Sequence, residues 1–181
     1  GDAGTRSLNF ALQAALNPPK PGKQERRFGE LVFREGDRVM QTRNDYDVVW
    51  QKEDGTAGTG IFNGDVGKIA KIDPSGELLE IVFDDRTATY TSDMLAELDM
   101  AYAMTVHKAQ GSEYRGVVFV GAPCAPSLMV RGVLYTAITR ARELLVIVGD
   151  DSAVNKMAEN DRRSRRYSGL KWRLRKGGEE K

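Results

Sequence analysis

Hydrophobic residues recur along the chain with three different spacings, and each spacing predicts a different kind of element. In residues 5–16 they stand three or four positions apart, which is the spacing of one face of an α-helix. That face is formed by Leu8, Leu12, Ala15 and Leu16. Thr5 is available as the N-cap, and Asn17-Pro18-Pro19 ends the helix. Residues 20–30, rich in charge, Pro and Gly, are predicted to be a linker.

From Leu31 to about Leu98 the hydrophobic residues form short runs that end at Gly, Asp or Pro. These runs predict strands at residues 38–42, 66–72, 78–83 and 87–91. Short strands at this spacing are typical of a small antiparallel barrel, and the segment is long enough for an SH3-like one. Residues 46–60, with Gly55, Gly58 and Gly60 close together, are predicted to be a long mobile loop.

After Asp99 the pattern changes to strands that alternate with helices. Apolar runs predict strands at residues 101–106, 117–120 and 144–148, and a helix lies within residues 127–143. A last short helix follows Asp150-Asp151-Ser152. This alternation is typical of an α/β domain. Since three strands are too few for a complete doubly wound sheet, we expect a fraction of a parallel sheet whose other strands lie upstream of Gly1.

Composition excludes several classes of protein. One Cys and one His cannot build a Cys/His zinc cluster or a disulfide framework, so no metal site is predicted. No apolar run approaches the roughly 20 residues of a membrane helix, and we expect a reducing, intracellular setting. The net charge of +1 conceals an asymmetry, because residues 162–181 hold 9 basic and 2 acidic residues and residues 1–161 hold 18 and 24. The basic tail could contact phosphates or be a solvated chain end.

Two segments place polar residues where chemistry is expected. In the first, an apolar run leads into Thr105, His107 and Lys108 and then into Gln110, Gly111 and Glu113. If the run is a strand, these groups lie at the carboxyl edge of the sheet, where α/β proteins bind ligands. The alternative is an ordinary turn with exposed polar side chains.

The second segment is the helix within residues 127–143. Thr136 and Arg140 stand four residues apart, as do Tyr135 and Thr139, so hydroxyl groups and a guanidinium share one stripe. A guanidinium directed at a phosphate stabilises the charge that develops in phosphoryl transfer, which makes Arg140 a candidate anion-binding residue. The alternatives are that Arg140 caps its own helix or pairs with Glu143.

In this order and about 20 residues apart, the two segments resemble motifs V and VI of superfamily 1 DNA helicases, most closely the RecD-like branch. The resemblance covers roughly residues 3–172. Its upstream part consists of Gly4-Thr5, Leu8-Asn9, Leu12-Gln13, Leu16-Asn17-Pro18-Pro19, Phe33-Arg34, Gly36-Asp37-Arg38-Val39-Met40-Gln41, Asn44-Asp45-Tyr46 and Ile61-Phe62-Asn63-Gly64-Asp65-Val66-Gly67.

The resemblance implies an α/β fold, in which a partial RecA-like parallel sheet of P-loop NTPase type carries an inserted SH3-like β-barrel. Residues 1–30 would be the first helix and linker of motor domain 2A, and residues 31–98 the inserted barrel, domain 2B. Residues 99–161 would be the C-terminal part of domain 2A, and residues 162–181 the basic tail. The implied activity is that of the C-terminal part of an ATP-dependent 5′ to 3′ DNA helicase.

The resemblance also implies roles for single residues. Arg140 would be the catalytic residue that reaches the γ-phosphate of ATP, and Gly111 and Glu113 would contact the nucleotide. The implied DNA-binding residues are Thr105, His107 and Lys108, and those that couple the two ligands are Gln110, Thr136 and Thr139.

The implied cofactor is ATP with Mg²⁺, bound mainly by the N-terminal motor domain of the same protein. That domain and single-stranded DNA are the expected partners. We further expect a monomer, no membrane association and a bacterial-type cytoplasmic location.

Departures from the family pattern limit what the chain can do alone. No Gly-x-x-x-x-Gly-Lys-Ser/Thr phosphate loop exists, because Gly22-Lys23 and Gly67-Lys68 precede Gln and Ile. Residues 79–85 resemble a Walker B strand but are better explained as a strand that ends in a hairpin turn. We therefore expect no ATPase activity from the chain alone.

Two other functions fit the same sequence. One is the helicase portion of a conjugative relaxase, and the other is a non-catalytic module that binds single-stranded nucleic acid. In the latter, Tyr46, Trp50 and Phe62 of the barrel could stack on bases. The barrel could instead be a brace for the strand that leaves the motor.

Overall fold

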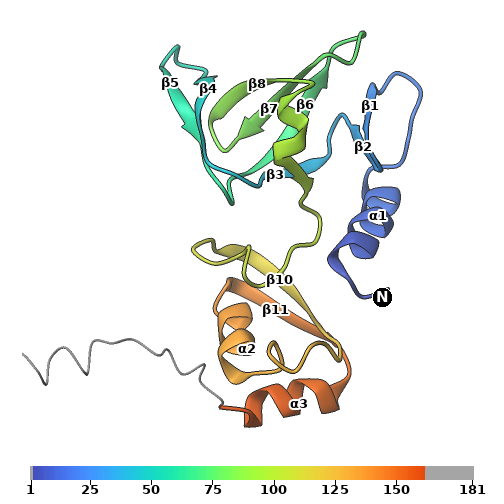
Figure 1. Cartoon of the computed structure of the whole chain (residues 1–181), viewed down its shortest axis with the longest axis vertical. Helices are drawn as coiled ribbons and strands as arrows, with labels where there is room; N and C mark the ends of the chain where they lie inside the picture. The colour runs from blue at the N-terminus through green and yellow to red at the C-terminus, as the bar shows by residue number, and fades with distance from the viewer. Residues whose placement is uncertain (1, 162–181) are drawn as a thin grey trace, which may run out of the picture. The chain divides into compact units, whose positions relative to one another are not determined.

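The computed structural model describes residues 2–161, and the predicted basic tail at 162–181 lies outside the described residues (Figure 1). The chain divides into two compact units, one that extends to Ser112 and one that begins at Glu113. The fold is mixed α/β, with a large antiparallel sheet in the first unit and a parallel strand pair in the second. Within residues 2–161, no helix is long and apolar enough to cross a membrane.

The first unit opens with helix α1 (Thr5–Leu16), which has the predicted bounds but a different buried face. Asn9 and Gln13 are buried, together with Asn17 at the C-cap, whereas Leu16 is 69% exposed. The N-cap is Gly4 and no side chain caps the helix, so the prediction of Thr5 as N-cap is wrong. Leu8 and Leu12 of the predicted face are half-buried. The most deeply buried side chains of the helix therefore form a polar stripe beside these two leucines.

The segment predicted to be a linker contains the first strand and the turn of a β-hairpin. Strands β1 (Glu25–Phe28) and β2 (Leu31–Arg34) pair antiparallel, with Phe28 opposite Leu31. Gly29 has a φ of 57° and supplies the left-handed turn residue. Exposed and half-buried residues alternate along β1, so Arg27 faces solvent while Arg26 and Phe28 lie on the half-buried face.

The rest of the first unit is a seven-stranded antiparallel sheet with the strand order β5-β4-β8-β7-β6-β3-β9 (Figure 1). The strands are β3 (Arg38–Gln41), β4 (Asp45–Gln51), β5 (Ala57–Ile61), β6 (Val66–Ile72), β7 (Leu78–Phe83), β8 (Arg86–Thr91) and β9 (Leu98–Met100). A short 3-10 helix, η1 (Met94–Glu97), leads into β9. The turn between β7 and β8 follows Phe83, whose register partner is Arg86. Residues 79–85, which resemble a Walker B strand, are thus a strand that ends in a hairpin turn, as predicted.

Residues 46–60 are not a long loop, because they contribute to the β4–β5 hairpin. Two of the three glycines that suggested mobility, Gly58 and Gly60, instead leave room for aromatic rings. A Cβ at Gly58 would lie 2.4 Å from the Trp50 ring, and one at Gly60 would lie 2.9 Å from the Phe62 ring. The hairpin therefore needs glycine for close packing.

The core of this sheet is formed by inward-facing residues of its strands and by residues of β2 and η1. Its buried members are Phe33, Val39, Val48, Ile61, Ile69, Ile72, Leu79, Ile81, Phe83, Ala88, Tyr90, Leu95, Leu98 and Met100. Because most of these residues alternate with exposed ones along β6, β7 and β8, each strand is buried on one face only.

The second unit pairs β10 (Tyr114–Gly121) in parallel with β11 (Ala141–Gly149), connected through helix α2 (Arg131–Ile138). Helix α3 (Asp151–Glu159) follows, and its N-cap Asp150 accepts a hydrogen bond from the Ser152 N–H at 2.8 Å. Both strands and the last helix were predicted, although α2 is shorter than expected. Apolar residues of the strand pair remain exposed in the described part of the chain, among them Val118, Leu144 and Val148.

Candidate functional site

The segment after residue 101 is a series of turns, so the strand predicted at 101–106 is wrong. The Ala109 N–H donates to the Thr105 carbonyl at 3.1 Å, and the Lys108 N–H donates to Thr105 Oγ1 at 3.3 Å. The Gln110 N–H donates to the His107 carbonyl at 3.3 Å. These bonds form a compact turn on which Thr105, His107, Lys108 and Gln110 are exposed.

Two further features shape this motif turn, defined as residues 105–111. Gly111 has a φ of 86°, a conformation that side chains other than glycine rarely adopt. Lys108 Nζ lies 3.0 Å from Asp99 Oδ2, which ties the turn to strand β9. The structure thus brings five predicted residues, Thr105, His107, Lys108, Gln110 and Gly111, onto one turn of the first unit.

Helix α1 holds the chain just before the motif turn. The Asn9 amide donates to the Ala103 carbonyl and accepts from the Ala103 N–H, both at 2.8 Å. A side chain thereby satisfies both backbone groups, which a strand partner would otherwise satisfy. Because both backbone groups of Ala103 are occupied in this way, they cannot pair with a neighbouring strand.

A buried carboxylate, Asp37, connects helix α1 to the barrel. Its side chain is 0% exposed and accepts four hydrogen bonds, two at each oxygen. Oδ1 accepts from Asn17 Nδ2 at 2.7 Å and from the Tyr102 hydroxyl at 2.8 Å. Oδ2 accepts from Gln13 Nε2 at 2.6 Å and from the Arg34 N–H at 2.8 Å. The burial of this charge is thus compensated by a complete set of donors.

Asp37 and its four donors are called the Asp37 hub below. No role was assigned to this hub from the sequence. The sequence feature that could have indicated it is a polar residue at every fourth position on one side of the helix: Asn9, Gln13 and Asn17. The hub also changes the chemistry of Tyr102, which stands two residues before Met104. Burial raises the pKa of Tyr102 to about 12, and the hydrogen bond to the Asp37 carboxylate adds to the increase. The phenol therefore stays a neutral donor at physiological pH.

The second unit brings together Glu113, Arg140 and Arg142. Glu113 Oε2 lies 2.7 Å from Arg142 Nε in an exposed ion pair. The hydrogen bond from Arg142 and then its charge lower the pKa of Glu113, and the charge of Arg140 contributes less. Glu113 is therefore a carboxylate whose anionic form is stabilised mainly by Arg142.

Arg140 follows the C-terminus of α2 and folds back onto it. Its Nε donates to the Thr136 carbonyl at 3.1 Å, and its NH2 group donates to Thr139 Oγ1 at 3.2 Å. Glu143 instead pairs with Arg115, at 3.0 and 3.1 Å. Of the alternatives considered for Arg140, helix capping is present and pairing with Glu143 is not. The Thr136 carbonyl and the Thr139 hydroxyl thus orient the guanidinium at the end of α2.

The three barrel aromatics named as stacking candidates differ in accessibility. Tyr46 is 66% exposed and meets Phe62 edge-on, with ring centroids 5.6 Å apart. The Trp50 ring is packed against Gly58 and lies about 6 Å from both Lys52 Nζ and the Arg86 guanidinium. Tyr46 and Phe62 therefore remain candidates for stacking, and Trp50 is part of the barrel packing.

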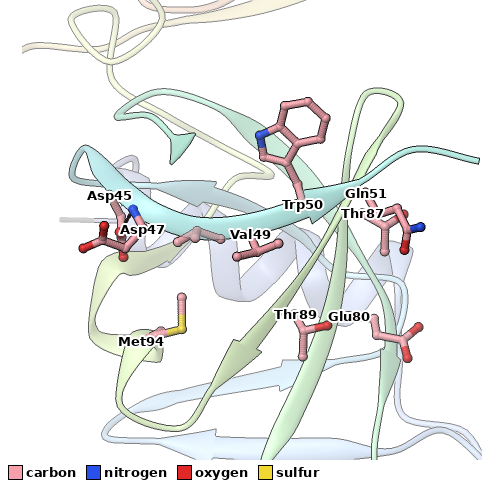
Figure 2. A pocket seen from close by; sticks show the side chains of 10 residues that line it. Asp45, Asp47, Val49, Trp50, Gln51, Glu80, Thr87, Thr89 and Met94 are labelled. Carbon is pink, nitrogen blue, oxygen red and sulfur yellow. Dashed lines mark hydrogen bonds between the residues drawn. The ribbon is translucent and has the colours of Figure 1, made fainter. Parts of the chain in front are cut away.

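A groove of about 530 Å³ lies beside β4 (Figure 2). Its lining includes the carboxylates of Asp45, Asp47 and Glu80 together with Val49 and Thr89, and Figure 2 shows Trp50 and Val49 on opposite sides of the β4 ribbon. No Lys or Arg lines this β4 groove. Such a lining repels phosphate, which argues against nucleic acid at this face.

The implied cofactor fits the described residues only in part. Arg140 and its neighbouring hydroxyl groups suit the anionic end of a nucleotide. In the part of the chain that the structure describes, no group of three or more His, Cys, Asp or Glu side chains could hold a metal ion. Residues 2–161 thus suit the phosphates of ATP and hold no ligand cluster for Mg²⁺.

Comparison with known families identifies the class of protein. Residues 8–83 match the family described as the ATP-dependent RecD-like DNA helicase SH3 domain. Residues 100–148 match the UvrD-like helicase C-terminal domain. The two matches follow one another along the chain and define a helicase C-terminal region.

Individual relatives agree with this class. The ATP-dependent RecD2 DNA helicase of Deinococcus radiodurans is 36% identical over 165 residues, which are 91% of this chain and 21% of the relative. The RecBCD enzyme subunit RecD of Mycolicibacterium smegmatis is 32% identical over 143 residues, 79% of this chain and 23% of the relative. The chain belongs to the RecD-like DNA helicase family, and it spans about a fifth of the length of these relatives.

A solved structure with weak similarity is a double mutant of the Pif1 helicase from Bacteroides. It is 16% identical, with a TM-score of 0.40, and the match covers 84% of this chain and 42% of the Pif1 chain. This similarity is too weak for a comparison of site geometry.

Proposed function

We propose that this chain is the C-terminal part of an ATP-dependent 5′ to 3′ DNA helicase, in which it completes the ATP site and grips single-stranded DNA. The observation that carries this proposal is the placement of Arg140. The end of α2 holds its guanidinium through the Thr136 carbonyl and the Thr139 hydroxyl, so the cation is oriented before any ligand arrives. An oriented charge costs little reorganisation during reaction.

In the proposed mechanism, a P-loop motor domain would hold most of the ATP with its Mg²⁺, and the γ-phosphoryl group would be transferred from ADP, the leaving group, to water. Arg140 directs its guanidinium at the γ-phosphate and stabilises the charge that develops there. Glu113 and the backbone at Gly111, where φ is 86°, contact the nucleotide. Thr136 and Thr139 hold Arg140 and transmit its movement to α2.

The motif turn supplies the DNA contact. Thr105, His107 and Lys108 are exposed on it and offer a hydroxyl, an imidazole and an ammonium group to the phosphodiester backbone. Asn9 and the Asp37 hub fix the chain directly before the turn, so the grip rests on a rigid base. Gln110, between the DNA-facing and nucleotide-facing positions, would couple the two ligands.

The exposed strand pair supports the partial-sheet interpretation. Parallel strands are normally buried on both faces, yet Val118, Leu144 and Val148 are 66%, 60% and 51% exposed. We propose that further strands and helices of the RecA-like domain cover them in the whole protein. The whole protein would act in the cytoplasm as a monomer.

The test is ATP hydrolysis by a polypeptide that joins this chain to a P-loop motor domain of the same family. It should hydrolyse ATP in the presence of single-stranded DNA, and Arg140→Ala should abolish turnover while DNA binding persists. The chain alone should show no turnover. Turnover by the chain alone that requires Arg140 would contradict the proposal, and joint loss of turnover and DNA binding would assign Arg140 a folding role.

A further inference from the structure

A second groove of the barrel has the opposite charge to the β4 groove. It has a volume of about 730 Å³ and lies beside β3 and β6, at the C-terminal end of α1. Lys23, Arg38 and Lys68 line this β3–β6 groove together with Tyr102, and no carboxylate does. One groove of the barrel is therefore acidic and the other is basic, so the net charge of the barrel does not predict what either groove binds.

Two of the cations face each other across a strand pair. Arg38 on β3 and Lys68 on β6 are direct register partners, and both are exposed. Like charges in opposed positions destabilise a sheet, so this pair weakens the fold unless an anion joins it. Among residues 2–161, none of the seven ion pairs includes Arg38, Lys68 or Lys23.

The surroundings of the groove leave its positive charge available. Lys23 Nζ donates to Asn17 Oδ1, which is a neutral acceptor. The nearby Asp37 carboxylate is fully buried, and Asn17 and Tyr102 are two of its four donors. The Tyr102 ring is held by its hydroxyl bond to Asp37, so a fixed aromatic side chain stands beside the cations.

We propose that the β3–β6 groove binds the phosphate backbone of single-stranded nucleic acid. A row of cations beside an aromatic side chain is the combination that proteins use to hold single strands without reading their sequence. The inference rests on the proposed function, and it adds a contact site separate from the motif turn. It also assigns the barrel a direct role on DNA, through this face and not through the acidic β4 groove.

The experiment is a salt titration of DNA binding by the 181-residue chain. Fluorescence anisotropy with a labelled oligothymidylate gives the slope of log K against log salt concentration, which falls by about 0.7 for each lost contact with a single-strand phosphate. The double variant Arg38→Ala/Lys68→Ala should lower the slope by about 1.4, and Lys68→Gln alone by about 0.7. A duplex hairpin should bind more weakly than the single strand.

A matched control is Lys71→Ala. Lys71 is exposed on the same strand as Lys68, but it lies outside the groove lining and has Glu80 as its register partner. Its removal should leave the slope unchanged. Because Arg38 and Lys68 repel each other, the double variant should melt no lower than the wild type, which separates lost contacts from lost folding.

Other results of these binding experiments would each contradict a specific part of the proposal. An unchanged slope in the double variant, or an equal fall with Lys71→Ala, overturns the groove and leaves the motif turn as the DNA contact. Displacement of the oligonucleotide by inorganic phosphate at constant ionic strength makes the groove a small-anion site instead. If the wild-type chain binds no oligonucleotide at all, the proposed DNA grip fails together with the groove.

Discussion

Replacement of Asp37 by Asn tests whether the polar hub, rather than apolar packing, docks helix α1. Asn keeps the shape but puts an NH2 group where one carboxylate oxygen accepts two hydrogen bonds. The less costly orientation turns the NH2 group toward Asn17 and Tyr102, because the Arg34 N–H on the other side cannot reverse its direction. One bond to a charged group is then lost and the others weaken.

The size of the effect follows from these bonds. Loss of a charge-assisted bond with its donor left buried costs about 1.5–3 kcal/mol, and weakening of the remaining bonds brings the expected total to about 3 kcal/mol. Tyr102→Phe removes one of the four donors and should cost about half as much. Since small domains are stable by only about 5–15 kcal/mol, Asp37→Asn should clearly shift the unfolding midpoint.

The assay is urea unfolding of the chain, followed by Trp50 fluorescence in a Trp172→Phe background. The control is Asp54→Asn, because Asp54 caps an exposed turn by accepting from the Thr56 N–H at 2.8 Å, and Asn can accept the same bond. This control should leave the midpoint unchanged. A loss below about 1 kcal/mol for Asp37→Asn, or an equal loss for both variants, would refute the role of the hub.

Three further predictions concern other parts of the chain. Gly58→Ala should lower the free energy of unfolding by about 1–3 kcal/mol in the same urea assay, because its Cβ would lie 2.4 Å from the Trp50 ring; no loss would contradict the packing role. The raised pKa of Tyr102, about 12 against an ordinary 10.0, stabilises the fold below pH 10, and this contribution is lost as the pH rises toward 12. Tyr102→Phe should therefore make the decline of the melting temperature between pH 10 and pH 12 less steep. An unchanged decline would contradict the raised pKa of Tyr102. Arg142→Ala should leave the urea midpoint where it is, because the pair with Glu113 is exposed; a clear shift would show a structural role.

The bounds of helix α1 could be predicted from the sequence, whereas its most deeply buried side chains could not. The bounds of α1 follow from its leucine spacing, yet Leu16 is exposed and Asn17 is buried. A prediction from hydrophobic periodicity assumes that the helix packs on an apolar surface. Here the buried polar residues Gln13 and Asn17 instead contact the Asp37 carboxylate. A carboxylate some twenty residues away in the sequence leaves no trace in the local pattern of the helix.

Two predictions were wrong, the loop at residues 46–60 and the strand at residues 101–106. The first was based on glycines and the second on an apolar run. Gly58 was interpreted as a loop residue, but it accommodates Trp50 inside a hairpin. Residues 101–106 are apolar enough for a strand, but the Asn9 side chain occupies the backbone groups of Ala103. In both cases a contact with a residue of another element decides the local structure: the Trp50 ring packs over Gly58, and the Asn9 amide bonds the backbone of Ala103.

The candidate site shows a similar division. Residue types and spacing were enough to select the motif turn and Arg140, because hydroxyl, imidazole and guanidinium groups gathered in two short segments. The present partners of Arg140, Thr136 and Thr139, could be predicted only as an alternative to phosphate binding. The opposed pair of Arg38 and Lys68 depends on strand register, which the sequence alone does not specify.

The central claim is that Arg140 completes an ATP site. Its most direct test is DNA-stimulated ATP turnover by the chain joined to a P-loop motor domain, measured beside the affinity for single-stranded DNA. The account predicts that Arg140→Ala lowers kcat by about 10³-fold or more with DNA affinity unchanged, as expected for an arginine finger. Arg115→Ala, an exposed neighbour paired with Glu143, should retain full turnover. Equal turnover in the wild type and Arg140→Ala would contradict the claim.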